Sequence, residues 1–126
     1  MRFSSRVPEA AEQAAVVREL RRLRIRFCAV PNGGRRDRIE SINLKRQGVE
    51  PGAPDLLILT PPPAWPWSPG TALEMKRTGA QWSDVRKEQV EWLTELAVLG
   101  WYVVVGYGAA DALEKLRKAG YYSNPK

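Results

Sequence analysis

The sequence contains no histidine and a single cysteine, Cys28. Without histidine the chain cannot build a Ser-His-Asp or Cys-His triad, and one cysteine excludes both an intramolecular disulfide and a zinc finger. Any hydrolytic chemistry must therefore depend on carboxylates, lysine and a hard cation held by oxygen ligands. The single cysteine is also typical of a protein from a reducing compartment.

Long apolar runs are missing as well, since no stretch approaches the roughly 20 residues that cross a bilayer. The first residues are basic but are not followed by the apolar segment of a secretory signal. These absences lead us to expect a cytoplasmic protein. The length of 126 residues, with 44% hydrophobic and 27% charged residues, predicts one folded domain over residues 1–126.

Positive charge is concentrated in one quarter of the chain. The net charge is +6, yet residues 18–46 alone carry +7, so the remainder is slightly negative. Such a concentration is expected for a protein that binds a polyanion, although a merely solvated basic face would give the same count. The basic residues of this segment are Arg18, Arg21, Arg22, Arg24, Arg26, Arg35, Arg36, Arg38, Lys45 and Arg46, against the acidic residues Glu19, Asp37 and Glu40.

The hydrophobic pattern predicts an α/β fold with a mixed central sheet flanked by helices. Five prolines between 61 and 70 exclude a strand there, and the spacer predicts that the strands on either side pair antiparallel. The polar segment 35–52 is expected to be a loop, with a helical turn around Ile39–Arg46. The expected elements, in order, are a helix at 8–23, strands at 24–30, 55–60 and 71–76, a helix from Ser83 or Asp84 to about Leu99, a strand at 101–107 and a helix from Asp111 to about Lys118.

Three polar residues lie at unusual positions in this pattern. Asp55 begins an apolar strand, and Glu74 and Lys76 stand two apart on the next strand, which points both side chains to one face. Each of these residues alone is explained by a turn or an ion pair. Together, a carboxylate and an ammonium inside an apolar sheet are costly unless paired or bound to metal. Asp55 and Glu74 can hold Mg²⁺, while Lys76 can orient or deprotonate a water molecule or bind phosphate.

The string Gly52-Ala53-Pro54-Asp55, followed by Glu74-Met75-Lys76, resembles the core of the PD-(D/E)XK nucleases. Three further features narrow the resemblance to the VRR-NUC group: the segments at 30–34 and 44–56, and Gln89 in the following helix. The resemblance runs from about Pro8 to Leu116. It implies a restriction-endonuclease-like core, ordered αβββαβ with an extra C-terminal helix.

The resemblance also implies roles for individual residues. Asp55 and Glu74 would bind the metal with the backbone carbonyl of Met75, and Lys76 would be the catalytic lysine. Gln89 would point into the site from its helix. A further carboxylate would come from the first helix. Glu12 is preferred, with Glu9, about one turn away, as the alternative.

The implied activity is that of a Mg²⁺- or Mn²⁺-dependent, structure-specific DNA endonuclease acting on branched DNA such as four-way (Holliday) junctions, in a bacterial or phage-infected host cell. Two cuts in a junction imply a homodimer, for which Trp65, Trp67, Leu113 and Leu116 are interface candidates. A nuclease of flaps, ends or single strands and a non-cutting DNA-binding module remain alternatives. The expected DNA contacts are Asn32, Arg35, Arg36, Lys45 and Arg46, which a turn and solvated charges would also explain.

Overall fold

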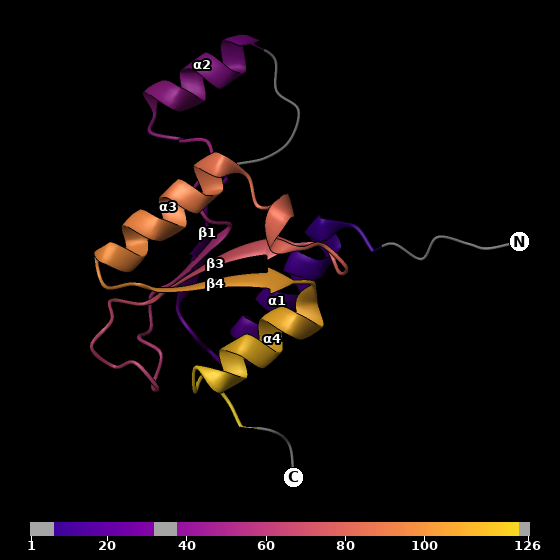
Figure 1. The fold of residues 1–126 in the computed structure, drawn as a ribbon, viewed down its shortest axis with the longest axis vertical. Helices are drawn as coiled ribbons and strands as arrows, with labels where there is room; N and C mark the ends of the chain where they lie inside the picture. The colour runs from indigo at the N-terminus through magenta and orange to yellow at the C-terminus, as the bar shows by residue number, and fades with distance from the viewer. Residues whose placement is uncertain (1–6, 32–37, 124–126) are drawn as a thin grey trace, which may run out of the picture.

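The computed structural model describes residues 7–31 and 38–123 of the chain, which form a four-stranded sheet with helices on both faces (Figure 1). No helix among these residues is long and apolar enough to cross a membrane. The elements are α1 (Glu9–Arg22), β1 (Phe27–Ala29), α2 (Arg38–Arg46), β2 (Leu56–Ile58), β3 (Thr71–Lys76), the 3-10 turn η1 (Trp82–Asp84), α3 (Lys87–Val98), β4 (Tyr102–Tyr107) and α4 (Ala109–Lys118).

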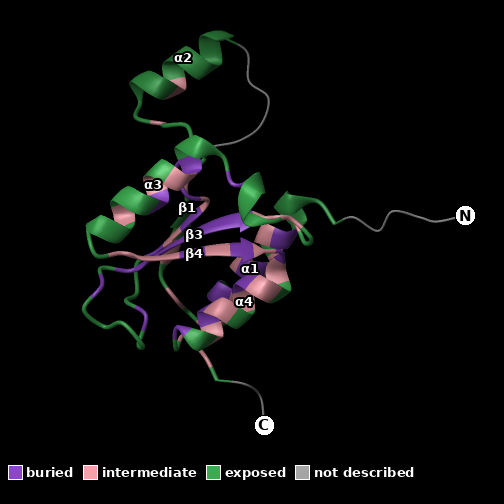
Figure 2. Ribbon diagram, viewed as in Figure 1, coloured by how far each residue is buried: buried purple, intermediate pink, exposed green. Residues whose placement is uncertain are grey.

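The strands follow one another across the sheet in the order β1-β2-β3-β4. The β1–β2 and β2–β3 pairs are antiparallel, and the β3–β4 pair is parallel, because α3 carries the chain back to the starting edge. The antiparallel pairing of β2 with β3 confirms the expectation from the proline-rich spacer. Both central strands are almost wholly buried, as the purple ribbon of β3 shows (Figure 2).

The apolar core lies between the sheet and the pair α1 and α4. Leu73 and Met75 of β3 are fully buried there, against Val16 and Leu20 of α1. Leu116 of α4 lies in the same core and Leu113 packs against it, so neither is free for the dimer interface considered from the sequence. The opposite face of the sheet is covered by α3, and Glu74 and Lys76 point to that side.

Several element boundaries differ from the expectation. Residues 38–46 form the complete helix α2 rather than a turn within a loop; it has no buried residue and extends away from the sheet (Figure 2). The chain makes the 3-10 turn before α3, which begins at Lys87 rather than near Ser83. Helix α4 begins at Ala109, because Gly108 turns the chain with a φ of 92° directly after β4.

Candidate metal centre and active site

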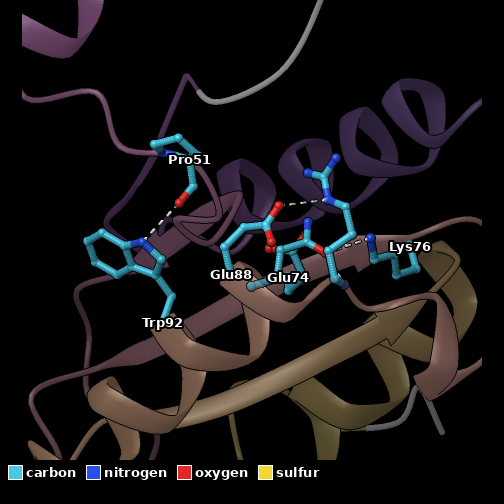
Figure 3. A network of polar contacts seen from close by, with 7 residues as sticks. Pro51, Glu74, Lys76, Glu88 and Trp92 are labelled. Carbon is cyan, nitrogen blue, oxygen red and sulfur yellow. Dashed lines mark hydrogen bonds and ion pairs between the residues drawn. The ribbon is translucent and has the colours of Figure 1, made fainter.

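The candidate site lies at the C-terminal end of β3, where the polar residues of that strand meet α3 and the beginning of α1 (Figure 3). Glu9, Asp55 and Glu74 each offer one carboxylate oxygen, and these oxygens lie within 4.8 Å of one another. Glu74 is only 1% exposed, while Asp55 is half-buried and Glu9 is exposed. The cluster is therefore open to solvent on the Glu9 side and closed behind Glu74.

One oxygen of this cluster lacks a hydrogen-bond donor. Glu74 Oε2 accepts a bond of 2.9 Å from the Gln89 side-chain amide, whereas the buried Glu74 Oε1 has no partner among the described residues. Asp55 Oδ2 accepts a bond of 2.7 Å from the backbone N–H of Met75. A buried carboxylate oxygen without a donor is costly unless a proton or a cation neutralises it.

The pKa values of the cluster also indicate that its carboxyl groups need a proton or a cation. Burial, followed by the nearby charge of Asp55, raises the pKa of Glu74 from 4.5 to about 9. Burial and the charge of Asp55 also raise the pKa of Glu9, although Lys76 and Arg86 oppose the rise. Carboxylates this close together repel one another unless a cation lies between them. Oxygen donors of this kind are those that Mg²⁺ and Mn²⁺ prefer, so the residues fit a hard divalent ion.

The backbone of Met75 also faces the cluster. Its N–H donates to Asp55, and in an extended strand the N–H and C=O of one residue point to the same side. The Met75 carbonyl therefore points toward the Asp55 side, whereas the Met75 side chain is buried in the core on the other layer.

The side-chain amide of Gln89 links Lys76 to Glu74. Its Oε1 accepts bonds of 2.9 Å from Lys76 Nζ and from the backbone N–H of Arg86, and its amide donates to Glu74. Because Gln89 is 4% exposed and uses both ends of its amide, its orientation is fixed. The structure thus brings Lys76 and Gln89 to the carboxylate cluster, as the sequence led us to expect.

The loop before Asp55 is tied to α3. Trp92 Nε1 donates to the Pro51 carbonyl at 3.2 Å (Figure 3). Gly52 has a φ of 87°, and a Cβ at this position would lie 2.7 Å from the backbone of Glu88. The glycine that opens the Gly52–Asp55 string is needed for this close approach, which sets where Asp55 enters the site.

Glu12 lies elsewhere, and this corrects the preferred assignment of the helix carboxylate. Its Oε2 accepts bonds from the Thr78 N–H at 2.8 Å and the Thr78 hydroxyl at 2.7 Å, and its Oε1 accepts one from the Ala109 N–H at 3.2 Å. Both oxygens are thus occupied, and Glu9, the alternative, is the helix residue in the cluster. Glu12 joins α1 to the segment after β3 and to the first turn of α4. The sequence could not separate the two glutamates, because both lie in the first turn of one helix.

The expected DNA contacts are only partly placed. Asn32, Arg35 and Arg36 lie outside the described residues. Lys45 and Arg46 are exposed in the last turn of α2. Two further residues that the sequence did not single out bear on the site: Arg86, whose N–H helps to orient Gln89, and Thr78, which binds Glu12. The Arg86 contact is only half of a capping box, with the Gln89 side chain accepting from the Arg86 N–H, and no Ser or Thr at position 86 marks it in the sequence.

The fold and the site define a restriction-endonuclease-like α/β protein, in which a carboxylate cluster from α1, the start of β2 and β3 lies beside a lysine of β3. The family model of the VRR-NUC domain matches residues 7–110, and the chain belongs to this family, whose fold is nuclease-like. A solved structure described as a VRR_NUC domain protein is similar in fold, with a TM-score of 0.72 and 23% identity over 90% of this chain and 88% of the other. Among curated proteins, none matched.

Replacing Glu12 should destabilise the fold. Glu12→Ala removes the acceptor of three hydrogen bonds, and we expect the free energy of unfolding to fall by about 2–4 kcal/mol, since bonds to a charged acceptor are stronger than neutral ones. Glu12→Gln keeps one acceptor oxygen and should lose less. Urea denaturation measures both variants. A loss below about 0.5 kcal/mol for Glu12→Ala would contradict the structural role of this carboxylate.

The raised pKa of Glu74 predicts how stability depends on pH in the metal-free protein. The folded state holds the Glu74 proton more tightly than the unfolded state, so this contribution is complete below pH 4.5 and is lost as the pH rises toward about 9. The slope should not exceed about 1.4 kcal/mol per pH unit for one proton. Thermal unfolding in EDTA across this window should show the decline, and Glu74→Gln should flatten it. An equal slope in that variant would show that Glu74 is ionised in the folded protein.

Proposed function

We propose that this protein is a divalent-metal-dependent DNA endonuclease whose active site consists of Glu9, Asp55, Glu74, Lys76 and Gln89. The observation that carries the proposal is the meeting of three carboxylates from three separate elements around a buried oxygen that has no donor, with a lysine held beside them. Membership of the VRR-NUC family supports the same activity.

Glu9, Asp55 and Glu74, together with the Met75 carbonyl, would hold the metal, which is Mg²⁺ or Mn²⁺. When bound, the ion lowers the pKa of a water molecule and stabilises the negative charge that develops on the phosphate. The protein prepares the site for this ion: Met75 N–H fixes Asp55, and the Gln89 amide fixes one oxygen of Glu74, which leaves the other free. Binding must displace the proton of Glu74, so affinity should rise with pH.

Lys76 supplies a positive charge next to the carboxylates. Its ammonium group donates one hydrogen bond to Gln89, and its two other N–H donors can bind a phosphate oxygen or hold the attacking water. Gln89 is a positioning residue, since it joins Lys76 to Glu74 through one amide. In this proposal a scissile phosphate would lie between the ammonium and the carboxylate cluster.

Branched DNA, including four-way junctions, is the substrate that we propose. Arg38, Lys45 and Arg46 give α2 a positive surface that can contact the sugar-phosphate backbone without reading base sequence. Cutting two strands of a junction requires two sites of this kind, which a homodimer would supply. Trp67, which is 72% exposed, remains an interface candidate, and Trp65 packs beside it and against Tyr102.

Metal binding should distinguish the two glutamates of α1. Glu9→Gln removes a proposed ligand and should weaken Mn²⁺ binding about tenfold or more, with little change in stability because Glu9 is exposed. Glu12→Gln is the matched control, one helical turn away; its remaining oxygen can still accept from Thr78 and keep α1 in place, so it should retain most of the affinity. Calorimetric titration of both variants with Mn²⁺ measures this difference. The ligand assignment is wrong if Glu12→Gln loses the metal and Glu9→Gln keeps it.

DNA cleavage tests the proposed activity. We expect labelled junction DNA to be cut with Mg²⁺ or Mn²⁺ and to remain intact with EDTA, and flap, single-stranded and linear duplex DNA to be cut more slowly. Lys76→Ala should lower the rate at least about a hundredfold while DNA binding persists. Lys118→Ala, an exposed lysine in the last turn of α4, is the control and should cut at the normal rate.

The alternatives give different results in the same experiment. Preferred cutting of flaps, ends or single strands would replace the proposed substrate but keep the chemistry. Tight DNA binding without product under any divalent ion would show a binding module and would refute the endonuclease. Equal rates of cutting for the Lys76→Ala and Lys118→Ala variants would refute the assigned site.

A further inference from the structure

Two surface grooves lie end to end along α1, on the side that leads away from the carboxylate cluster. The first, of about 480 Å³, begins at Ala10 and Gln13, next to Glu9. The second, of about 470 Å³, continues past the end of α1 to Cys28 and Ala29 of the edge strand β1. Because Val17 and Arg21 line both grooves, the two form one continuous channel on the surface, which we call the α1 groove.

Arginines dominate the far part of the α1 groove. Its floor is apolar, and none of the described residues that line it is acidic. The acidic residue closest in sequence to the arginines of the groove, Glu19, is paired with Arg22 on another side of the helix. The guanidinium groups of the groove take part in no ion pair with the described residues, and they belong to Arg18, Arg21, Arg24 and Arg26.

The conformation of Arg24 is a second, independent observation. Arg24 is the only non-glycine residue with a positive φ, 57°, among the residues that the structure describes. It occupies the turn that ends α1, in which Arg24 N–H donates to Arg21 O and Ile25 N–H donates to Leu20 O. Glycine is the usual residue at this position of such a turn, because a side chain there is strained. The fold therefore carries an arginine where glycine would fit better, which indicates a use for the side chain outside the fold.

The side chain of Arg21 is held in place by a contact within the protein. Its guanidinium group lies 5.9 Å from the centre of the Phe27 ring, in a cation–π contact that joins α1 to β1. Along α1, which rises about 1.5 Å per residue, Arg18 and Arg21 stand roughly 13 and 18 Å from Glu9. One strand of duplex DNA carries a phosphate about every 3.4 Å of helix axis, so this reach corresponds to about four or five phosphates.

We propose that the α1 groove binds the sugar-phosphate backbone of one arm of the DNA substrate, several nucleotides from the cut, through Arg18, Arg21, Arg24 and Arg26. This proposal rests on the proposed nuclease function and adds to it a contact surface distinct from α2. The groove begins at Ala10, the residue after Glu9 in α1, so an arm seated in it would have its nearer end toward the carboxylate cluster. The surface positions the substrate and makes no contact with the reacting atoms.

The test uses the full chain in EDTA, where DNA is bound without being cut, and a fluorescently labelled junction. Arg24→Gly should leave the unfolding temperature unchanged or raise it by up to about 5 °C, because the strained side chain is removed. The same change should weaken binding about fivefold and lower the salt dependence of log Kd by about one. A residue needed only for the fold would give the opposite combination, namely lower stability with unchanged binding.

A double variant and a matched control complete the experiment. Arg18→Gln with Arg26→Gln should weaken binding by about tenfold or more and lower the salt dependence by about two. Arg22→Gln removes the same charge from the same helix outside the groove and should bind as the unchanged protein does. If the groove variants bind as Arg22→Gln does, while the unchanged protein still cuts DNA in Mg²⁺, the groove proposal fails alone. If binding depends on the groove but no divalent ion gives product, the nuclease proposal fails and the groove remains a DNA-binding surface.

Discussion

The repulsion between two neighbouring carboxylates, one of them buried, is the constraint around which this structure is arranged. Glu74 keeps one oxygen without a donor while Asp55 and Glu9 lie within a few ångströms, a combination that the fold tolerates only with a proton or a cation in place. A protein selected for stability alone would place an apolar side chain at this point of β3. The free-energy cost of these close carboxylates is concentrated at one end of β3, as is common at functional sites. Neighbouring contacts keep the carboxyl groups from moving apart.

Three separate ties prevent that separation. The Gly52–Asp55 loop is held against α3 through Pro51 and Trp92, which fixes the entry of Asp55. Gln89 holds Glu74 and Lys76 from the first turn of α3. Glu12 joins α1 to the segment that follows β3, and thereby sets the position of Glu9 one turn earlier. The site is thus assembled by the meeting of three elements on one strand end, and not by any one local motif.

Much of this arrangement could be predicted from the sequence, because the alternation of side chains along a strand leaves little choice. In β3, Leu73 and Met75 had to face the core if Glu74 and Lys76 faced the other layer, and the structure has this arrangement. The antiparallel pairing of β2 and β3 was predicted on different grounds, from the short proline-rich spacer between them. The two-residue period of a strand carried the information in the first case, and the length and composition of the spacer carried it in the second.

What could not be predicted depends on tertiary contacts that no local pattern records. Glu9 and Glu12 share one helical turn, and only the position of Thr78 and Ala109 decides which of them faces the cluster. Helix α2 has no buried residue, so no packing partner fixes its extent, and its short sequence with Ile39 and Ile42 three residues apart predicted only a turn. Helix α3 begins at Lys87, where the Gln89 side chain accepts a hydrogen bond from the Arg86 N–H. The sequence pattern did not distinguish this start from the 3-10 turn just before it.

The most direct test of the central claim is a crystal structure of the protein soaked in Mn²⁺, with the ion located by its anomalous scattering. We expect one strong peak between the carboxylates of Glu9, Asp55 and Glu74, with the Met75 carbonyl oriented toward it. A peak at Glu12, or no peak near Glu74, would contradict the account.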